Sequence, residues 1–263
     1  ESVDFDFKIH VDGASGSYTA AVVEDGQTTP VDGGIKFTDG GATYKLHDGQ
    51  QLIIYGLNNG AHYTVTEDAE GGYDTEKTGD TGTIAAAETA QAAFTNTYKV
   101  TTPATVKGST DLTGTKAIDG RAWVDDESYT FVLAQLQSGT TDDAGTAVDT
   151  VVVKGDPNKG EDPIKFNFKD LSFDTPGVYR YTIYENDAQS TIPAGVSASR
   201  ARYRVTITVT DNHDGTLKAE TTIQQTRRDD GTALDPWGEP GTAKFVNTYQ
   251  VGETEATIQA NKK

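Results

Sequence analysis

Two segments of the chain end in the same way. Residues 92–99 read AAFTNTYK and residues 243–250 read AKFVNTYQ, so each is a strand-like run with an asparagine after its apolar centre, followed by Thr-Tyr. Each is preceded, at a distance, by a second similar run, YTVTE at 63–67 and YTIYE at 181–185. An internal repeat of this kind indicates two related domains in tandem. A chain of 263 residues is long enough for each of them to bury a core.

The rest of the sequence is typical of antiparallel β-structure. Short runs that alternate apolar and polar side chains are separated by DG, GG, NG and PG turns. Because no long helix-forming stretch occurs, we predict an all-β fold of two tandem Ig-like β-sandwich domains. The predicted strands lie near 3–10, 17–24, 43–47, 50–55, 61–67 and 91–98 in the first domain, and near 111–117, 128–137, 148–153, 164–168, 177–185, 201–210, 216–225 and 242–249 in the second.

The repeat also sets the predicted domain boundaries. Domain one covers residues 1–99, a linker follows at 100–110, and domain two covers residues 111–249. Domain two has an opening strand before its first long core strand. Domain one begins directly with ESVDFDFKIHV, so its own first strand is missing. The tail at 250–263 supplies a candidate for a strand of this kind.

The tail resembles the opening strand of a following domain. TIQANK at 257–262 aligns with DLTGTK at 111–116, which places Lys262 on Lys116. We therefore expect the ends of the chain not to coincide with domain boundaries: it begins after the first strand of one domain and ends with the first strand of the next. A secretion signal and a wall anchor are expected outside the chain, which contains no methionine.

Composition excludes several classes of function. The net charge of −18 argues against binding to nucleic acids or to anionic membranes, because both require clustered Lys and Arg. The absence of cysteine excludes disulfides and thiolate metal sites. The four histidines are scattered and no acidic loop has the spaced ligands of a calcium site, so we expect no metal and no cofactor. A membrane-spanning helix requires a run of about 18 apolar residues, and no stretch of the sequence approaches that length.

Three side chains of domain two can react if they are buried together: Lys116 on its first strand, Glu185 in mid-domain and Asn247 on its last strand. Burial disfavours charge, so the amine loses a proton and the carboxyl gains one. The neutral amine can attack the side-chain carbonyl of the asparagine. The protonated glutamate polarises that carbonyl and passes protons to the leaving ammonia. The product is an amide between side chains, formed once and not turned over.

These stretches resemble the backbone-pilin and Cna B-type isopeptide domains of Gram-positive surface proteins. The resemblance rests on LTGTKAIDGR, PGVYRYTIYEN and AKFVNTY in domain two, and on YKLHDGQQLIIYGLNNGAHYTVTEDAEGGY and AAFTNTY in domain one. It implies that Lys116 is the nucleophile, Glu185 the catalytic acid and Asn247 the electrophile. By the same match, Glu67 and Asn96 are the acid and the electrophile of domain one. Family members are pilus shafts or stalks of wall-anchored adhesins, so an extracellular, cell-wall location is implied.

Domain one departs from the family pattern because it has no lysine on an opening strand. Lys8 is the nearest candidate, but Phe5, Phe7 and Ile9 alternate with it, which predicts that Lys8 faces solvent. Lys262 fits the pattern better. We expect the tail to insert into domain one of the next molecule as a donated strand, which would give head-to-tail assembly. The competing interpretation is an arbitrary boundary with a disordered tail.

The predicted function is mechanical and non-enzymatic: a stalk or shaft segment that resists force and proteolysis. Its expected partners are other copies of the chain, or neighbouring domains of the same parent protein. A ligand-binding adhesin module for a host protein or glycan is the alternative. A glycosidase would need two acids in one cleft. Glu67 and Glu185 occupy equivalent positions in different domains, which speaks against such a pair.

Overall fold

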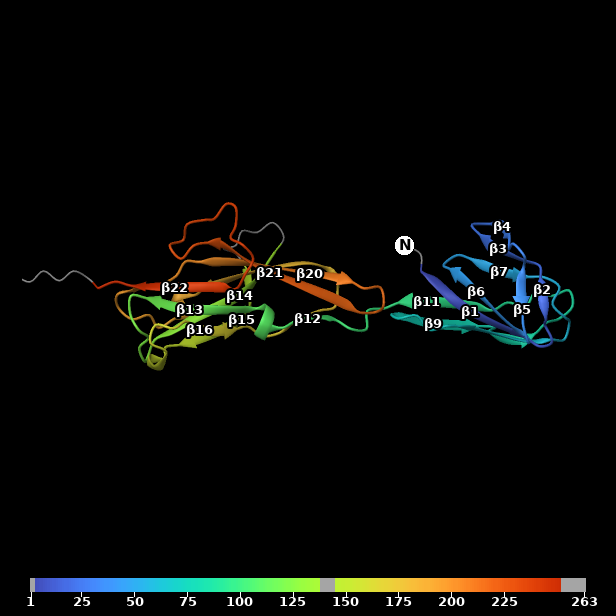
Figure 1. Ribbon diagram of the computed structural model, residues 1–263, viewed down its shortest axis with the longest axis horizontal. Helices are drawn as coiled ribbons and strands as arrows, with labels where there is room; N and C mark the ends of the chain where they lie inside the picture. The colour runs from blue at the N-terminus through green and yellow to red at the C-terminus, as the bar shows by residue number, and fades with distance from the viewer. Residues whose placement is uncertain (1–2, 138–144, 252–263) are drawn as a thin grey trace, which may run out of the picture. The chain divides into compact units, whose positions relative to one another are not determined.

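The computed structural model describes residues 3–137 and 145–251 (Figure 1). Contacts between residues divide the chain into two compact units. One comprises the residues up to Thr101 together with His213–Gly215, and the other comprises Thr102–Asn212 and the residues from Thr216 onward. The names domain one and domain two are used below for these units. In the described parts of the chain, no helix has the length and apolarity needed to cross a membrane.

Domain two contains two sheets that face each other and enclose its core. The larger sheet has the order β15 (Gly145–Lys154), β14 (Ser128–Leu136), β18 (Gly177–Glu185), β20 (Arg202–Asp211) and β21 (Leu217–Arg227). The smaller sheet has the order β16 (Ile164–Asn167), β13 (Thr113–Asp119), β22 (Ala243–Tyr249) and β19 (Val196–Ser197). Within it, β13 and β22 pair in parallel, whereas the other pairs are antiparallel.

Aromatic side chains from both sheets meet in this core. Phe131 of β14 stacks on Phe166 of β16 with ring centroids 4.2 Å apart, and it contacts Phe245 of β22 at 4.9 Å. All three are buried. The alternation along β20 buries every second side chain, as expected for a strand with one face on the core. The sandwich is therefore held together by apolar contacts between the two sheets.

The segment at 100–110 is more ordered than a linker. Its strand β12 (Ala104–Val106) pairs with β17 (Leu171–Phe173), and the short helix α1 (Gly108–Asp111) follows. Ala104 and Val106 are buried, which explains why this run joins domain two. A Cβ at Gly108 would lie 1.7 Å from the backbone oxygen of Phe168, so only glycine fits there. Two 3-10 turns complete the described secondary structure of the domain, η1 (Pro157–Lys159) and η2 (Asp187–Gln189).

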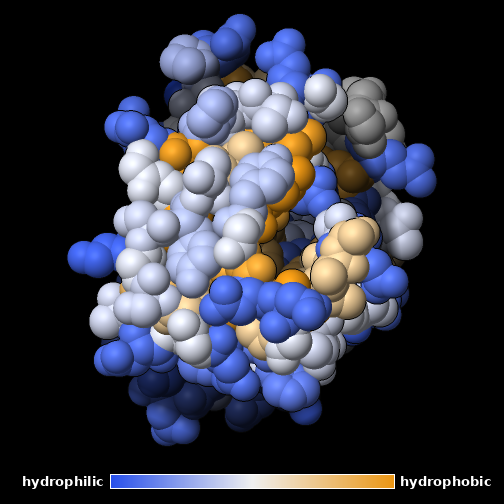
Figure 2. Space-filling model, turned by 90° about the vertical axis from the view of Figure 1, so that its right-hand side faces the viewer, coloured by the Kyte–Doolittle hydropathy of each residue, from blue (hydrophilic) through white to orange (hydrophobic). Residues whose placement is uncertain are grey.

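Domain one is built from smaller sheets. Its largest has the order β10 (Thr81–Thr83), β8 (His62–Glu67), β1 (Asp4–Val11) and β6 (Gly41–His47). The others are β11 (Ala93–Tyr98) with β9 (Tyr73–Thr78), β2 (Gly16–Tyr18) with β5 (Ile35–Phe37), and β4 (Gln27–Pro30), β3 (Ala20–Glu24) and β7 (Gln51–Ile54) in that order. Val11, Ala20, Ile35 and Phe37 lie at the centre of its core. Several apolar side chains around that core are only partly buried, and apolar surface is visible between polar side chains in Figure 2.

The predicted all-β fold is confirmed, and most predicted strands agree with the structure to within three residues. The strand predicted from residue 111 begins instead at Thr113, because α1 occupies the preceding residues. Strands β4, β5, β9, β10, β12, β17 and β19 were not predicted. Most are only two to four residues long, and β9 (YDTEKT) is largely exposed, so it lacks the apolar alternation that predicts a strand.

Candidate cross-linking site

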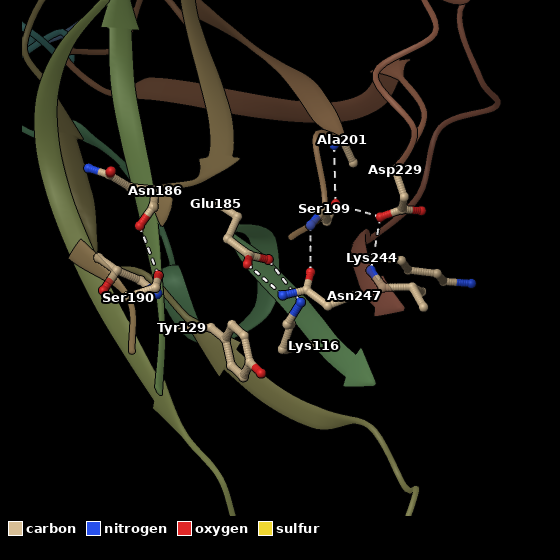
Figure 3. Close-up of polar contacts among 12 residues, drawn as sticks. Lys116, Tyr129, Glu185, Asn186, Ser190, Ser199, Ala201, Asp229, Lys244 and Asn247 are labelled. Carbon is tan, nitrogen blue, oxygen red and sulfur yellow. Dashed lines mark hydrogen bonds and ion pairs between the residues drawn. The ribbon is translucent and has the colours of Figure 1, made fainter. Parts of the chain in front are cut away.

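Three buried polar side chains meet inside domain two, and each comes from a different strand. Lys116 lies on β13, Asn247 on the parallel neighbour β22, and Glu185 ends β18 in the facing sheet (Figure 3). The alternation of β13 buries Gly114, Lys116 and Ile118 on one face, and that of β22 buries Asn247 in the same way. The pleat of the two strands therefore turns the lysine and the asparagine toward the core.

The carboxyl group of Glu185 joins the other two side chains. Lys116 Nζ lies 2.8 Å from Glu185 Oε2, and Asn247 Nδ2 donates a hydrogen bond to Glu185 Oε1, also at 2.8 Å. The side chains of Lys116 and Glu185 are completely buried, and Asn247 has no exposed surface. Polar groups so deeply buried must satisfy one another, because water cannot.

Burial shifts the two ionisable groups toward their neutral forms. It lowers the pKa of Lys116 from its ordinary 10.5 to about 8, although the attraction of Glu185 works in the opposite direction. Burial also raises the pKa of Glu185, against the influence of the lysine and of the hydrogen bond from Asn247. An uncharged amine is a nucleophile and a protonated carboxyl is a proton donor. Burial therefore shifts both groups toward the protonation states that amide formation would require.

An aromatic ring packs beside the lysine, and a second buried acid accepts a hydrogen bond from the hydroxyl of that ring. The ring of Tyr129 lies with its centroid 4.5 Å from Lys116 Nζ, and its hydroxyl donates to Glu127 Oε2 at 2.7 Å. Glu127 also accepts hydrogen bonds from Arg121 and from the backbone N–H of Val124. Burial raises the pKa of Tyr129, and the hydrogen bond to Glu127 raises it further, so the hydroxyl keeps its proton. Sequence reasoning did not single out this network.

The carbonyl oxygen of Asn247 has its own partner. The backbone N–H of Ser199 donates to Asn247 Oδ1 at 2.6 Å. The hydroxyl of Ser199 donates to Asp229 Oδ1, and the backbone N–H of Val246 donates to the same oxygen at 2.9 Å. Neither Ser199 nor Asp229 was predicted to belong to the site, because the contact depends on how two loops pack and not on a motif.

Domain one brings Glu67 and Asn96 together through a third residue. Thr75 Oγ1 donates to Asn96 Oδ1 at 2.7 Å and lies 3.3 Å from Glu67 Oε1. Glu67 Oε2 is buried and has no hydrogen-bond partner among the described residues. In that part of the chain, β11 pairs with β9 alone, whereas β22 of domain two pairs with both β13 and β19. The acid and the amide are thus present in domain one without a neighbouring lysine strand in the described residues.

The two lysines considered for domain one have different outcomes. Lys8 faces solvent, as its alternation with Phe5 and Ile9 predicts: its side chain is 60% exposed and forms an ion pair with Asp68. Lys262 lies outside the described residues. Among the described residues, no group of three or more His, Cys, Asp or Glu side chains is arranged to hold a metal ion.

Lys116 and Asn247 lie on adjacent strands of one sheet, and Glu185 ends a strand of the facing sheet, which is the arrangement that the sequence resemblance predicts for an isopeptide domain. The model of one such family, the Spy0128-like isopeptide containing domain, matches residues 112–250. This chain belongs to that family, which confirms the resemblance identified from the sequence. The model of a second family, a domain of unknown function (DUF7601), matches residues 1–98.

Solved structures give more distant likenesses. A mutant of the major pilin from Streptococcus pyogenes is 18% identical over 53% of this chain and 50% of its own, with a TM-score of 0.39. The chain thus spans about half the length of that pilin. An adhesin from Mobiluncus mulieris, containing intramolecular disulfide, isopeptide and ester bond cross-links, is 13% identical over 94% of this chain and 86% of its own, with a TM-score of 0.27. A search of curated proteins found no match.

Proposed function

We propose that the chain is a structural stalk or shaft segment of a pilin or adhesin on the surface of a Gram-positive bacterium. In this proposal, Lys116 and Asn247 form an isopeptide bond within domain two, and Glu185 catalyses its formation. The observation that carries the proposal is that one buried carboxyl group contacts both reacting side chains, each at 2.8 Å. Membership of an isopeptide-domain family supports it.

The reaction exchanges one amide for another. The neutral amine of Lys116 attacks Cγ of Asn247, and the new Nζ–Cγ bond replaces the Nδ2–Cγ bond. Glu185 gives its proton to Nδ2, which faces Oε1, and takes one from Nζ, which faces Oε2. Ammonia leaves, and Glu185 ends in the state in which it began. Because the product stays in the chain, the reaction occurs once and the protein is not an enzyme.

Such a bond suits a load-bearing segment. It joins β13 to β22, the strands that carry Lys116 and Asn247, so tension applied along the chain passes through a covalent link instead of the hydrogen bonds between strands. It also restricts the unfolded chain. By analogy with a disulfide that closes a loop of this size, the stabilisation is on the order of 5 kcal/mol.

We propose that domain one is completed by a strand from a neighbouring molecule. The donor is the segment 257–262, whose Lys262 would react with Asn96 under catalysis by Glu67, giving head-to-tail assembly. Two observations favour this arrangement. Glu67 Oε2 is buried without a partner in the described residues, whereas in domain two the carboxyl oxygen of Glu185 that does not face the asparagine contacts Lys116. Strand β11 also has no parallel neighbour there.

An extracellular position in the cell wall follows from this role, and other copies of the chain or adjoining domains of a longer parent protein are the partners.

The experiment that tests the cross-link within domain two is an intact mass under denaturing conditions for the wild type, Glu185→Gln and the matched control Glu67→Gln. We expect the wild-type and Glu67→Gln monomers each to be lighter than their own sequence mass by one ammonia. We expect the Glu185→Gln monomer to have its full sequence mass. A wild-type monomer at full mass would refute self-cross-linking.

A further inference from the structure

We infer that the backbone N–H of Ser199 binds the developing negative charge on Asn247 Oδ1 during bond formation, and that Asp229 is the positioning residue that holds this donor in place. The inference rests on the proposed function. It assigns to Ser199 the polarisation of the carbonyl that sequence reasoning gave to Glu185.

The orientation of the Asn247 side-chain amide follows from its two neighbours. A backbone N–H can only donate, so the atom that lies 2.6 Å from Ser199 N must be the amide oxygen. The amide nitrogen then faces Glu185 Oε1 at 2.8 Å. The glutamate therefore contacts the leaving group, and the carbonyl oxygen depends on Ser199.

Negative charge accumulates on Oδ1 when Lys116 Nζ attacks Cγ, because the C=O bond opens to a single bond. A fixed N–H that points at this oxygen stabilises the transition state more than the ground state, as in an oxyanion hole. The effect is large where water is excluded. Asn247 has no exposed surface and Ser199 is 3% exposed, so this donor lies in such a place.

Asp229 ties together the two segments that carry donor and acceptor. Its Oδ1 accepts from the Ser199 hydroxyl and from the backbone N–H of Val246, which precedes Asn247 on β22. Its backbone oxygen accepts from the N–H of Arg200, next to Ser199, at 2.9 Å. The Ser199 hydroxyl also accepts from the N–H of Ala201 at 3.1 Å. These bonds fix the distance between the connection that holds Ser199 and the strand that holds Asn247 (Figure 3).

Domain one has a donor at the equivalent oxygen. The Thr75 hydroxyl lies 2.7 Å from Asn96 Oδ1, as the Ser199 N–H lies 2.6 Å from Asn247 Oδ1. The two donors differ in chemical type, one a side-chain hydroxyl and the other a backbone amide. The same place is filled in both domains, which is expected if the reaction needs a donor there.

The test removes the N–H alone. The full chain is synthesised in a cell-free system and quenched in denaturant at timed intervals, and the fraction that has lost ammonia is measured by intact mass. The wild-type chain is the control. The same chain with a backbone ester at position 199, introduced as the α-hydroxy analogue of serine, keeps the side-chain hydroxyl that bonds Asp229 and lacks only the N–H. We expect the ester chain to react roughly 100- to 1000-fold more slowly than the control, with an unchanged pH profile because Lys116 and Glu185 are intact.

Asp229→Ala tests positioning, and Asp229→Asn tests its rescue, since an asparagine oxygen can accept the same bonds. We expect Asp229→Ala to react roughly 10- to 100-fold more slowly than the wild type and Asp229→Asn to recover most of the rate. A folded ester chain that reacts at the control rate would overturn the role of Ser199. An Asp229→Ala chain at the wild-type rate would overturn that of Asp229. Both results presuppose a wild type that loses ammonia, so they are distinct from failure of the proposed function.

One measurement leaves Ser199 unchanged and covers the case in which the ester chain does not fold. In the unreactive Lys116→Met chain, NMR can detect a scalar coupling across the hydrogen bond between Ser199 15N and Asn247 13Cγ. We expect this coupling, and its absence in the folded protein would overturn the inference.

Discussion

Lys116 and Asn247 lie on adjacent parallel strands and contact the two different oxygens of a single buried carboxyl group, that of Glu185. This relationship combines proximity with control of protonation. The lysine is brought to the oxygen that can take its proton, and the amide nitrogen to the oxygen that can supply one. The same burial that disfavours the charged forms also keeps water from competing.

Loss of the bond should reduce the stability of domain two. Asn247→Ala removes the electrophile, and we expect the free energy of unfolding to fall by at least about 5 kcal/mol, because the unfolded chain regains the freedom that the cross-link restricts. Denaturant titration with an intact-mass check measures the loss. Asn158→Ala, at an exposed asparagine, is the control and should change stability by less than about 0.5 kcal/mol. Equal stability of wild type and Asn247→Ala would contradict the prediction.

The chain without the bond should become more stable as the pH rises above 8. Burial lowers the pKa of Lys116 in the folded chain to about 8, compared with the ordinary 10.5 of the unfolded chain, and we expect folded Asn247→Ala to keep this shift because its Lys116 remains a free amine. Between these values the folded state binds fewer protons than the unfolded state, so stability rises with pH. From pH 8 to 10 we expect a gain on the order of 2 kcal/mol.

The control for this pH dependence is the double variant Lys116→Met with Asn247→Ala, which should show no such gain. The cross-linked wild type should not show it either, because its Lys116 nitrogen is an amide. The range stops at pH 10 because burial raises the pKa of Tyr203 to about 12, which reverses the trend at higher pH. A flat profile for Asn247→Ala between pH 8 and 10 would contradict the assigned burial of a free lysine.

Much of this site could be predicted because its chemistry lies in side chains that stand in repeated motifs. Asn247 and Glu185 were found from their counterparts Asn96 and Glu67, and Lys116 from the opening strand. Ser199 could not be found in this way, because it acts through a backbone N–H that almost every residue possesses. Asp229 is one acid among many in a chain with 40 Asp and Glu residues. Its role depends on tertiary contacts that connect two loops with β22.

The same division applies to the fold. Long strands with one buried face, such as β14 and β20, have an alternation that predicts them. Strands β9 and β19 do not, because one is largely exposed and the other has two residues. They are nevertheless the antiparallel neighbours of the asparagine-bearing strands β11 and β22. The packing around the side-chain amides of Asn96 and Asn247 was therefore the least predictable part of each domain.

Gly114→Ala should disturb the lysine strand. A Cβ at Gly114 would lie 2.3 Å from Cζ of Phe166, whose ring stacks on Phe131, so β13 or the ring must shift. We expect a loss of about 1–3 kcal/mol and slower bond formation, measured by denaturation and by timed intact masses. Gly241→Ala is the control, since a Cβ there has no heavy atom within 4 Å. Equal rates and stabilities for the two variants would contradict the close packing of β13.

Domain one should cross-link molecules to one another. We expect the wild-type chain to form dimers and higher species that resist denaturant, and Lys262→Ala or Asn96→Ala to abolish them. Denaturing gel electrophoresis at several protein concentrations is the measurement, and Lys263→Ala is the matched control. A ladder that survives Lys262→Ala would show that another lysine reacts, and a wild-type chain without a ladder would refute the donated strand.

The most direct test of the central claim is peptide mapping of the purified wild-type chain. After complete proteolysis, tandem mass spectrometry should identify one branched peptide in which the Lys116 and Asn247 segments are joined, lighter than the sum of the two by one ammonia. The corresponding linear peptides should be nearly absent. Recovery of both linear peptides at full mass and in equal amounts would show that the lysine and the asparagine, although buried together, do not react.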